Sequence, residues 1–315
     1  MEKTGRGGRM TKAILVLRNI TVENANAING LTWGFPAISN FLGYTHAIER
    51  KLPKKAGLTL TGCGVICHKH SVQAYQPKGW GDYYFGLTRN PLTQKEQSPA
   101  FIEEGRMHMT VSLVIPVEGD LDAMERADLI QAISDIAQTQ RLAGGTITSM
   151  GWVELMPIPE DDEVLKKFER RVLRRLIPGF ALIQRSDLLA SHVKESGKEV
   201  VDAFMDFSAL KYEATQDGEE VTWQKVSKPG DGWLVPISLG FRSISPIYQP
   251  GKVANLRDSM TPFRFAESVY SIGEWVSPHR AKTIQDIIWK YSVEENTGFY
   301  LTTNHFQPSS TQKGE

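Results

Sequence analysis

The chain has 315 residues, enough for about two average domains or for one domain with large insertions. Its 41% hydrophobic, 23% charged and 9% aromatic residues exclude a collagen-like, coiled-coil or wholly disordered chain. The 36 basic and 36 acidic side chains cancel, so contact with nucleic acid would require a local basic patch or partner subunits. Two cysteines cannot build a disulfide framework, and no apolar run approaches the ~20 residues of a membrane span. We therefore expect a globular cytoplasmic protein that does not enter a membrane.

The first half of the chain alternates predicted strands and helices. Residues 1–9 are rich in glycine and arginine and are interpreted as a leader or flexible arm. Apolar and β-branched residues predict strands over 12–22, 58–74, 107–115 and 146–156, the third of which stops at Pro116. Apolar residues at helical spacing predict one helix between Pro36 and Pro53 and another from Asp120 or Asp122 to about residue 142. This order predicts an α+β fold with a ferredoxin-like or RRM-like domain over residues 10–158, interrupted by a long insertion at residues 76–105.

The second half has weaker patterns. An amphipathic helix is predicted over residues 160–177, because its first turn is acidic and Pro178 follows it. Helices over 187–195 and 198–210 and strands over 221–226 and 233–239 come next. Two more helices are expected to begin at Thr261-Pro262 and Ser277-Pro278, since proline suits a first helical turn. Residues 159–306 are thus predicted to form an α+β C-terminal region, followed by a loose tail at 307–315.

The sequence contains no pattern that predicts catalysis, a metal or a cofactor. The G-x-S-x-G, P-loop, H-E-x-x-H and dinucleotide fingerprints do not occur. Cys63, Cys67, His68 and His70 lie close together, but on a strand the two cysteines would be about 13 Å apart at ~3.3 Å per residue, which disfavours zinc. An isolated histidine, such as His46, is more often a packing residue than a general base.

The insertion at residues 76–105 interleaves rings with cations and amides. Such a segment offers stacking faces together with donors for phosphates and base edges, as single-stranded RNA requires. The alternative is an ordinary loop whose rings pack back on the body, and composition favours neither. The residues concerned are Tyr75, Trp80, Tyr83, Tyr84 and Phe85, with Lys78, Arg89, Asn90 and Arg106.

Asparagines cluster at the end of the first predicted strand. Asn19, Asn24, Asn26 and Asn29 precede Trp33, so amides and a ring could read unpaired bases. Asparagines also simply favour turns, which is the alternative interpretation.

Cations dominate one face of the predicted helix at residues 160–177. They form two neighbouring rows at four-residue steps, Lys166, Arg170 and Arg174 beside Lys167, Arg171 and Arg175. Because like charges on one face repel one another, this surface suits nucleic-acid phosphate better than a generic solvated face paired with acidic loops, the alternative. A second anion site is expected at Ser277-Pro278, where a helix start would direct free N–H groups, with His279 and Arg280, at one point.

Several strings resemble one known family in order along nearly the whole chain. They are NANAINGLTWGFPAISNFLGYTHAIERK, TRNPL, EEGRMHM, RLAGG, RRVLRRLIPGFALI, GWLVPI and GEWVSPHR. The resemblance is to the second subunits of the type I-F CRISPR Csy surveillance complex, which are RAMP-superfamily proteins. It implies an RRM-like RAMP domain with the insertion as a thumb, and a non-catalytic subunit that pairs with the large subunit. It also implies that the chain holds the 5′ handle of the CRISPR RNA, caps the filament of backbone subunits and meets target DNA in the assembled complex.

On this basis the candidate RNA contacts combine the insertion, the asparagine cluster and the later strings. They are Asn24, Asn26, Trp33, Arg89, Asn90, Arg106, His108, Arg141, His279 and Arg280. Two other functions stay open. Related RAMP subunits cleave repeat RNA without a metal, and His46 or His108 could then be the base, although no paired acid and base is evident. A structural adaptor that touches only protein is the third possibility.

Overall fold

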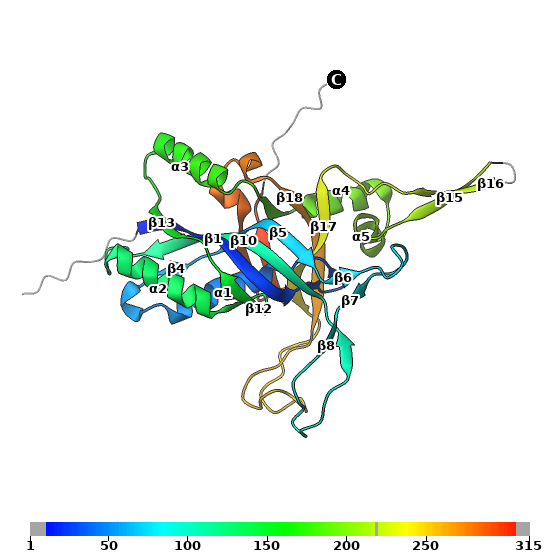
Figure 1. Cartoon of the computed structure of the whole chain (residues 1–315), viewed down its shortest axis with the longest axis horizontal. Helices are drawn as coiled ribbons and strands as arrows, with labels where there is room; N and C mark the ends of the chain where they lie inside the picture. The colour runs from blue at the N-terminus through cyan, green and yellow to red at the C-terminus, as the bar shows by residue number, and fades with distance from the viewer. Residues whose placement is uncertain (1–10, 218–219, 307–315) are drawn as a thin grey trace, which may run out of the picture.

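The protein is described by a computed structural model that covers residues 11–217 and 220–306. The predicted leader at 1–9 and tail at 307–315 lie outside these described residues. Within them the fold is mixed α+β, built around a 12-stranded, largely antiparallel sheet with five α-helices (Figure 1).

The α-helices of the described residues are short. None of them is long and apolar enough to cross a membrane. They are α1 (Ile38–Lys51), α2 (Arg126–Thr139), α3 (Asp162–Arg175), α4 (Ser186–Ser196) and α5 (Val200–Ser208), with short 3-10 turns η1 (Lys54–Ala56), η2 (Pro278–Arg280) and η3 (Ile284–Ile287).

The strands fall into the large sheet and four small hairpins. Those of the large sheet are β1 (Thr11–Asn26), β4 (Thr59–Leu60), β5 (Cys63–Val72), β10 (Arg106–Gly119), β11 (Arg141–Leu142), β12 (Gly145–Ser149), β13 (Val153–Pro157), β14 (Phe180–Gln184), β17 (Trp233–Ser243), β18 (Ala266–Val276), β19 (Ile288–Glu294) and β20 (Phe299–Asn304). The hairpins pair β2 (Ile28–Asn29) with β3 (Thr32–Trp33), β6 (Ala74–Tyr75) with β7 (Tyr84–Phe85), β8 (Leu87–Arg89) with β9 (Phe101–Glu103), and β15 (Tyr212–Asp217) with β16 (Glu220–Lys225).

The first half of the chain forms one side of the large sheet. Its strands are ordered β12 and β13, then β1, β10 and β5, all antiparallel to their neighbours. Helices α1 and α2 cover one face, where Phe41, Ile48 and Ile133 pack on inward residues of β1 and β10. The strands and helices predicted for this half are present, because their apolar residues follow the strand or helix period that the core requires.

Several predicted boundaries in this half are wrong, and one of them is that the strand predicted over 58–74 is broken into β4, β5 and β6. Strand β10 does not stop at Pro116 but continues to Gly119. The carbonyl of Pro116 accepts from Thr61 N at 3.0 Å, so the missing N–H faces the link between β4 and β5 and costs no bond to β1. The strand predicted over 146–156 is split into β12 and β13, and the second helix ends at Thr139, before β11.

The second half completes a ring of strands that begins and ends at β5. From β5 the order runs through β14, β18, β17 and β20 to β19. The ring closes because β5 pairs with β19 at Cys63 and Gly64, and with β14 at Ile66 and Cys67. Trp289 of β19 is fully buried inside, and its Nε1 donates to the carbonyl of Leu182 at 2.7 Å.

The remaining helices cover the outside of this framework. Helix α3 packs Val172, Leu173 and Leu176 against the sheet face opposite α1 and α2. Helices α4 and α5 form a separate small core with β17 and β18, centred on Phe207. The predictions for α3, α4 and α5 are therefore confirmed in position.

Both helices predicted at hydroxyl-proline pairs are wrong. Thr261-Pro262 lies in an irregular segment, where the Asp258 carboxylate accepts from the N–H of Met260 and Thr261 and ends the turn. Ser277-Pro278 opens only the three-residue turn η2. Strand β18 follows Pro262 instead, strands β19 and β20 follow Pro278, and these strands complete the ring that closes on β5.

His68 ties three parts of this framework together. Its Nδ1 donates to the carbonyl of Pro178 behind α3, and its Nε2 lies 2.7 Å from Ser112 Oγ on β10. Ser112 Oγ in turn accepts from Asn19 N at 3.0 Å, so the hydroxyl hydrogen is free to point at the imidazole. In this arrangement a neutral imidazole uses one ring nitrogen as a donor and the other as an acceptor. Burial, together with the charge of nearby Arg18, lowers the pKa of His68.

This lowered pKa predicts an acid-sensitive fold. Between the lowered pKa and 6.5 the unfolded chain binds a proton that the folded chain does not, so His68 makes stability fall as pH drops below about 6.5. We expect His68→Gln to reduce this pH dependence of the urea-unfolding free energy. His46→Gln, at an exposed position on α1, is the control and should leave it unchanged. A full pH dependence in His68→Gln would show that other groups cause it.

Candidate nucleic-acid interface

The insertion carries a cation stacked on a ring. It is not wholly irregular, because the β6–β7 and β8–β9 hairpins give it a frame that projects from the end of β5 and β10 (Figure 1). The β8–β9 pairing sets Arg89 opposite Phe101, and the guanidinium lies 4.1 Å from the ring centroid. Both side chains are exposed, and so is Asn90, which follows β8. A planar donor held on an aromatic face in solvent is suited to stacking on a base or binding a phosphate.

Some of the other rings of the insertion pack against the body of the protein, and others remain exposed to solvent. Trp33, outside the insertion, packs against Phe85 and Tyr83 at ring-centroid distances of 5.5 and 5.9 Å. These rings therefore do pack together at the base of the insertion. Trp80 nevertheless stays 70% exposed, with Lys78 5.4 Å above it.

Asn24, Arg106 and His108 are brought together where the insertion returns to the sheet. Asn24, with φ of 55°, accepts from Gln73 Nε2 at 2.7 Å, and its backbone N–H donates to His108 Nδ1 at 3.4 Å. Arg106 donates from Nη1 to the Asn24 carbonyl at 3.3 Å and forms an ion pair with Glu104. We call these residues and Gln73 the return cluster. Sequence reasoning missed Gln73, whose only signal is its place one residue before β6.

Asn26, Asn29 and Arg141 have local structural roles. Asn26 bonds the N–H and carbonyl of Ile28 through its side chain, and its backbone N–H donates to the carbonyl of Ala143. Asn29 is buried and accepts from Ser238 N at 3.1 Å. Arg141 is exposed and reaches the Gly144 carbonyl at 3.5 Å, so the β11–β12 turn lies beside Asn26.

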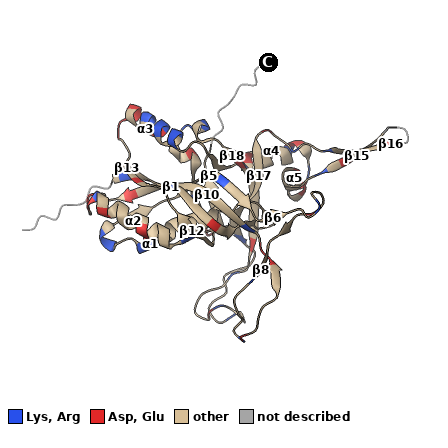
Figure 2. Ribbon diagram, in the orientation of Figure 1, with Lys and Arg blue, Asp and Glu red and all other residues tan. Residues whose placement is uncertain are grey.

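Helix α3 is rich in Lys and Arg, as Figure 2 shows. Two of the six predicted cations are paired: Lys166 with Glu163 at 2.9 Å, and Arg175 with Glu154 at 2.8 Å. The other four are exposed and have no ion pair among the described residues; they are Lys167, Arg170, Arg171 and Arg174, which we call the open row. Glu169 interrupts the sequence but turns inward and accepts from Ile284 N at 3.0 Å. Of the six cations predicted for this face, the structure therefore leaves four without an ion pair among the described residues.

Arg18 is a half-buried cation that sequence reasoning missed. It lies 5.3 Å from the Trp152 ring, and its Nε and Nη1 have no hydrogen-bond partner among the described residues. Burial and the charge of Arg175 lower its pKa. Arg18 thus adds positive potential beneath α3.

The expected anion site at Ser277 is not a helix start. A three-residue turn has no appreciable dipole, and His279 Nδ1 lies 2.8 Å from Ser277 Oγ. Arg280 is nevertheless exposed on η2, which contacts α3. His279 and Arg280 therefore lie on a short turn that packs against α3.

The two cysteines and the histidines considered as possible bases are not arranged for catalysis or metal binding in the described part of the chain. Burial raises the pKa values of Cys63 and Cys67 to about 12, so both remain thiols. In the part of the chain that the structure describes, no group of three histidine, cysteine or carboxylate side chains is placed to hold a metal ion. His108 contacts a backbone N–H and an amide, and His46 is exposed on α1.

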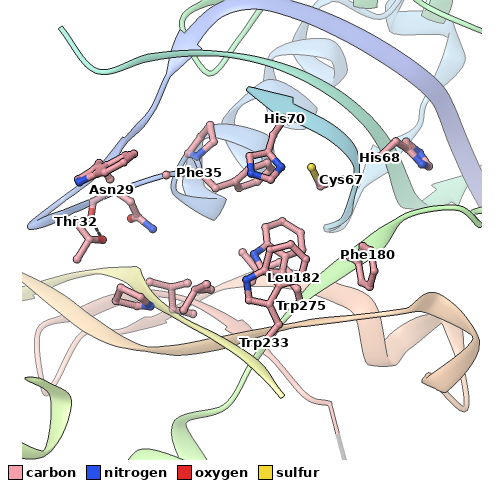
Figure 3. Close-up of a pocket in the computed structure, with 16 residues that line it drawn as sticks. Asn29, Thr32, Phe35, Cys67, His68, His70, Phe180, Leu182, Trp233 and Trp275 are labelled. Carbon is pink, nitrogen blue, oxygen red and sulfur yellow. Dashed lines mark hydrogen bonds between the residues drawn. The ribbon is translucent and has the colours of Figure 1, made fainter. Parts of the chain in front are cut away.

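An aromatic cavity of about 390 Å³ lies next to the insertion (Figure 3). Phe35 and His70 lie on one side of it, and Trp233 and Trp275 lie opposite (Figure 3). Trp33 belongs both to this cavity and to the ring cluster of the insertion.

Two comparisons relate this chain to known proteins. Residues 15–302 match the model of a family described as CRISPR-associated protein (Cas_Csy2). The chain is also 39% identical over 312 residues to CRISPR-associated protein Csy2 of Pseudomonas aeruginosa (strain UCBPP-PA14), covering 92% of this chain and 94% of that protein.

The open row predicts a stability cost of repulsion within α3. Arg170 and Arg174 are four residues apart, and a like-charged pair at this spacing destabilises a helix by about 0.2–0.5 kcal/mol. We expect Arg170→Gln/Arg174→Gln to raise the unfolding free energy by about that amount at low ionic strength, with the gain lost in high salt. Arg175→Gln should instead lower the unfolding free energy, because it removes the ion pair with Glu154. Denaturant unfolding at two salt concentrations measures both, and destabilisation by the double change would contradict the repulsion.

Proposed function

The chain belongs to the Csy2 family of CRISPR-associated proteins and is a component of the type I-F Csy complex, and within that complex we propose that it is a non-catalytic RNA-binding subunit. In this proposal it holds the 5′ handle of the CRISPR RNA, pairs with the large subunit and caps the filament of backbone subunits in the cytoplasm. The observation that supports it most is the Arg89–Phe101 stack.

The proposal includes a RAMP domain of the ferredoxin-like type over residues 10–158. Support comes from the order of elements β1, α1, β5, β10, α2 and then β12 and β13, with both helices on one face of the sheet. The insertion at 76–105 is then the thumb, and residues 159–306 are the C-terminal region. The two regions share one sheet, because β14 and β19 pair with β5.

The handle would lie across the insertion and the return cluster. There Arg89 supplies a stacking plane with donors, Asn90 an exposed amide, and His108 a ring oriented by its neighbours. Stacking is worth about 1–3 kcal/mol per base, and a hydrogen bond to a charged group about 1.5–3 kcal/mol. A few such contacts are therefore enough to select and retain single-stranded RNA.

The open row of α3 would attract phosphate without reading sequence. Its flexible cations supply charge, but little fixed geometry, to guide RNA or to target DNA. Arg280, exposed on η2 against α3, and half-buried Arg18, which lies close enough to Arg175 to feel its charge, would add to the same positive potential.

Incubating the full chain with labelled repeat RNA tests the proposed function. Retention of intact RNA is the expected result. Cleavage of the RNA would instead indicate an endoribonuclease, and no binding would indicate a structural adaptor.

Loss of the cation and the amide at the end of β8 should impair handle capture. We expect Arg89→Ala/Asn90→Ala to fold normally, because both side chains are exposed, yet to lower RNA affinity by at least tenfold and to yield few complete complexes. Lys95→Ala/Gln97→Ala is the matched control, since it removes one cation and one amide from the same insertion. Normal yield and full RNA occupancy for the first variant would reject the insertion as the handle clamp.

The open row should determine the salt dependence of nucleic-acid binding. Changing Arg170, Arg171 and Arg174 to Ala should reduce the slope of log K against log salt by about 0.7 per lost contact with single-stranded RNA, without changing sequence preference. Lys166→Ala/Arg175→Ala removes two paired cations and should change the slope less. An unchanged slope for both guide and target binding would assign α3 to protein contacts.

A further inference from the structure

The aromatic cavity beside the insertion is open and uncharged. Its volume is about 390 Å³, and none of the residues that line it is Asp, Glu, Lys or Arg. The imidazole of His68 at its edge is held neutral by burial, which lowers its pKa. A ligand group that enters the cavity is therefore itself uncharged and largely apolar, because no charge is present to compensate a buried one.

The rings that line the cavity leave flat faces uncovered. Trp233 meets Phe180 edge to face at 5.6 Å, and Trp275 meets Phe35 in the same way at 4.8 Å. The two indoles are tilted by 52° at 6.5 Å, so neither is stacked on the other. Trp233 is also 51% exposed, so part of its indole is accessible to a ligand.

The wall of the cavity formed by residues 28–36 is fixed in place. Asn29 binds Ser238 N of β17, and Gly30 lies so close to Tyr270 of β18 that a Cβ there would be 2.4 Å from the ring. Gly30 also has φ of 65°, which glycine adopts without strain. The cavity is thus preformed by contacts between distant strands and does not depend on ligand binding to assemble.

The cavity opens where RNA is proposed to run. Trp33, 48% exposed, lines it and also packs on Phe85 and Tyr83 of the insertion. His70 lines it as well, and its exposed imidazole has no hydrogen-bond partner among the described residues. The cations of the insertion are therefore absent from the cavity lining, which consists of rings, apolar side chains and a few uncharged polar residues, among them His70.

We propose that this cavity receives one unstacked nucleobase of single-stranded RNA, stacked on the exposed indole of Trp233 and hydrogen-bonded by His70. This inference rests on the proposed RNA-binding function and extends it to a site outside the thumb. A nucleobase is flat, uncharged and hydrogen-bonding, and its phosphate remains outside, next to the cations of the insertion. An apolar protein side chain would use the rings but neither His70 nor the adjoining cations.

Comparing RNA with and without bases tests the cavity directly. The probes are a short labelled single-stranded RNA of mixed sequence and the same ribose-phosphate backbone with every base removed. We expect Trp233→Ala to bind the complete RNA about 5- to 100-fold more weakly, to bind the abasic backbone as the unaltered chain does, and to keep the same salt slope. Trp223→Ala, which removes an exposed indole from the β15–β16 hairpin, is the matched control and should bind both probes normally.

Photocrosslinking of the unaltered chain keeps the test decisive if Trp233→Ala folds poorly. RNA that carries 4-thiouridine should crosslink to peptides containing Trp33, His70, Trp233 or Trp275. Normal RNA binding by Trp233→Ala, or crosslinks only within the insertion and α3, would show that the cavity does not bind a nucleobase. Either result would leave the proposed function standing. Failure of the unaltered chain to bind RNA would overturn both.

Discussion

The pairing of β5 along both of its edges is the constraint on which the rest of the structure depends. On one edge β5 follows β10 from Gly64 to Val72, and on the other it is shared between β19 and β14. Its central position forces Cys63, Val65 and Ile66 into complete burial. The same strand then leads into the insertion, so the ring of strands fixes where the thumb-like segment leaves the body. The residues proposed to bind the handle and the aromatic cavity are therefore held by one framework.

Local pattern predicted those elements whose burial repeats with a regular period. Strand β1, helix α1 and helix α3 present long apolar stripes to a core, and their types could be derived from the chain alone. The β18 to β20 region could not be, because its residues are buried by strands far away in sequence. Proline at 116, 262 and 278 was also misleading, since proline marks where an N–H is unnecessary, and a strand edge or a single turn satisfies that condition as well as a helix start.

The candidate site could be predicted by residue type but not by arrangement. Arg89 and Asn90 were identifiable as exposed donors, yet the stack on Phe101 depends on the β8–β9 register. The return cluster requires the pairing of β1 with β10, which places Asn24 near a histidine 84 residues away. Trp233 and Trp275 form the cavity only because β17 and β18 are adjacent. No spacing in the sequence carries such information.

The open row of α3 has a kinetic consequence for a chain whose net charge is zero. A neutral molecule feels no overall pull towards a polyanion, but one with four cations gathered on one helix, unpaired among the described residues, feels a torque. At low ionic strength, within a Debye length of about 10 Å at 0.1 M salt, that torque turns the α3 side towards the phosphates before contact is made. The helix would thus raise the fraction of encounters that arrive correctly oriented, and so the association rate, more than it prolongs the bound state.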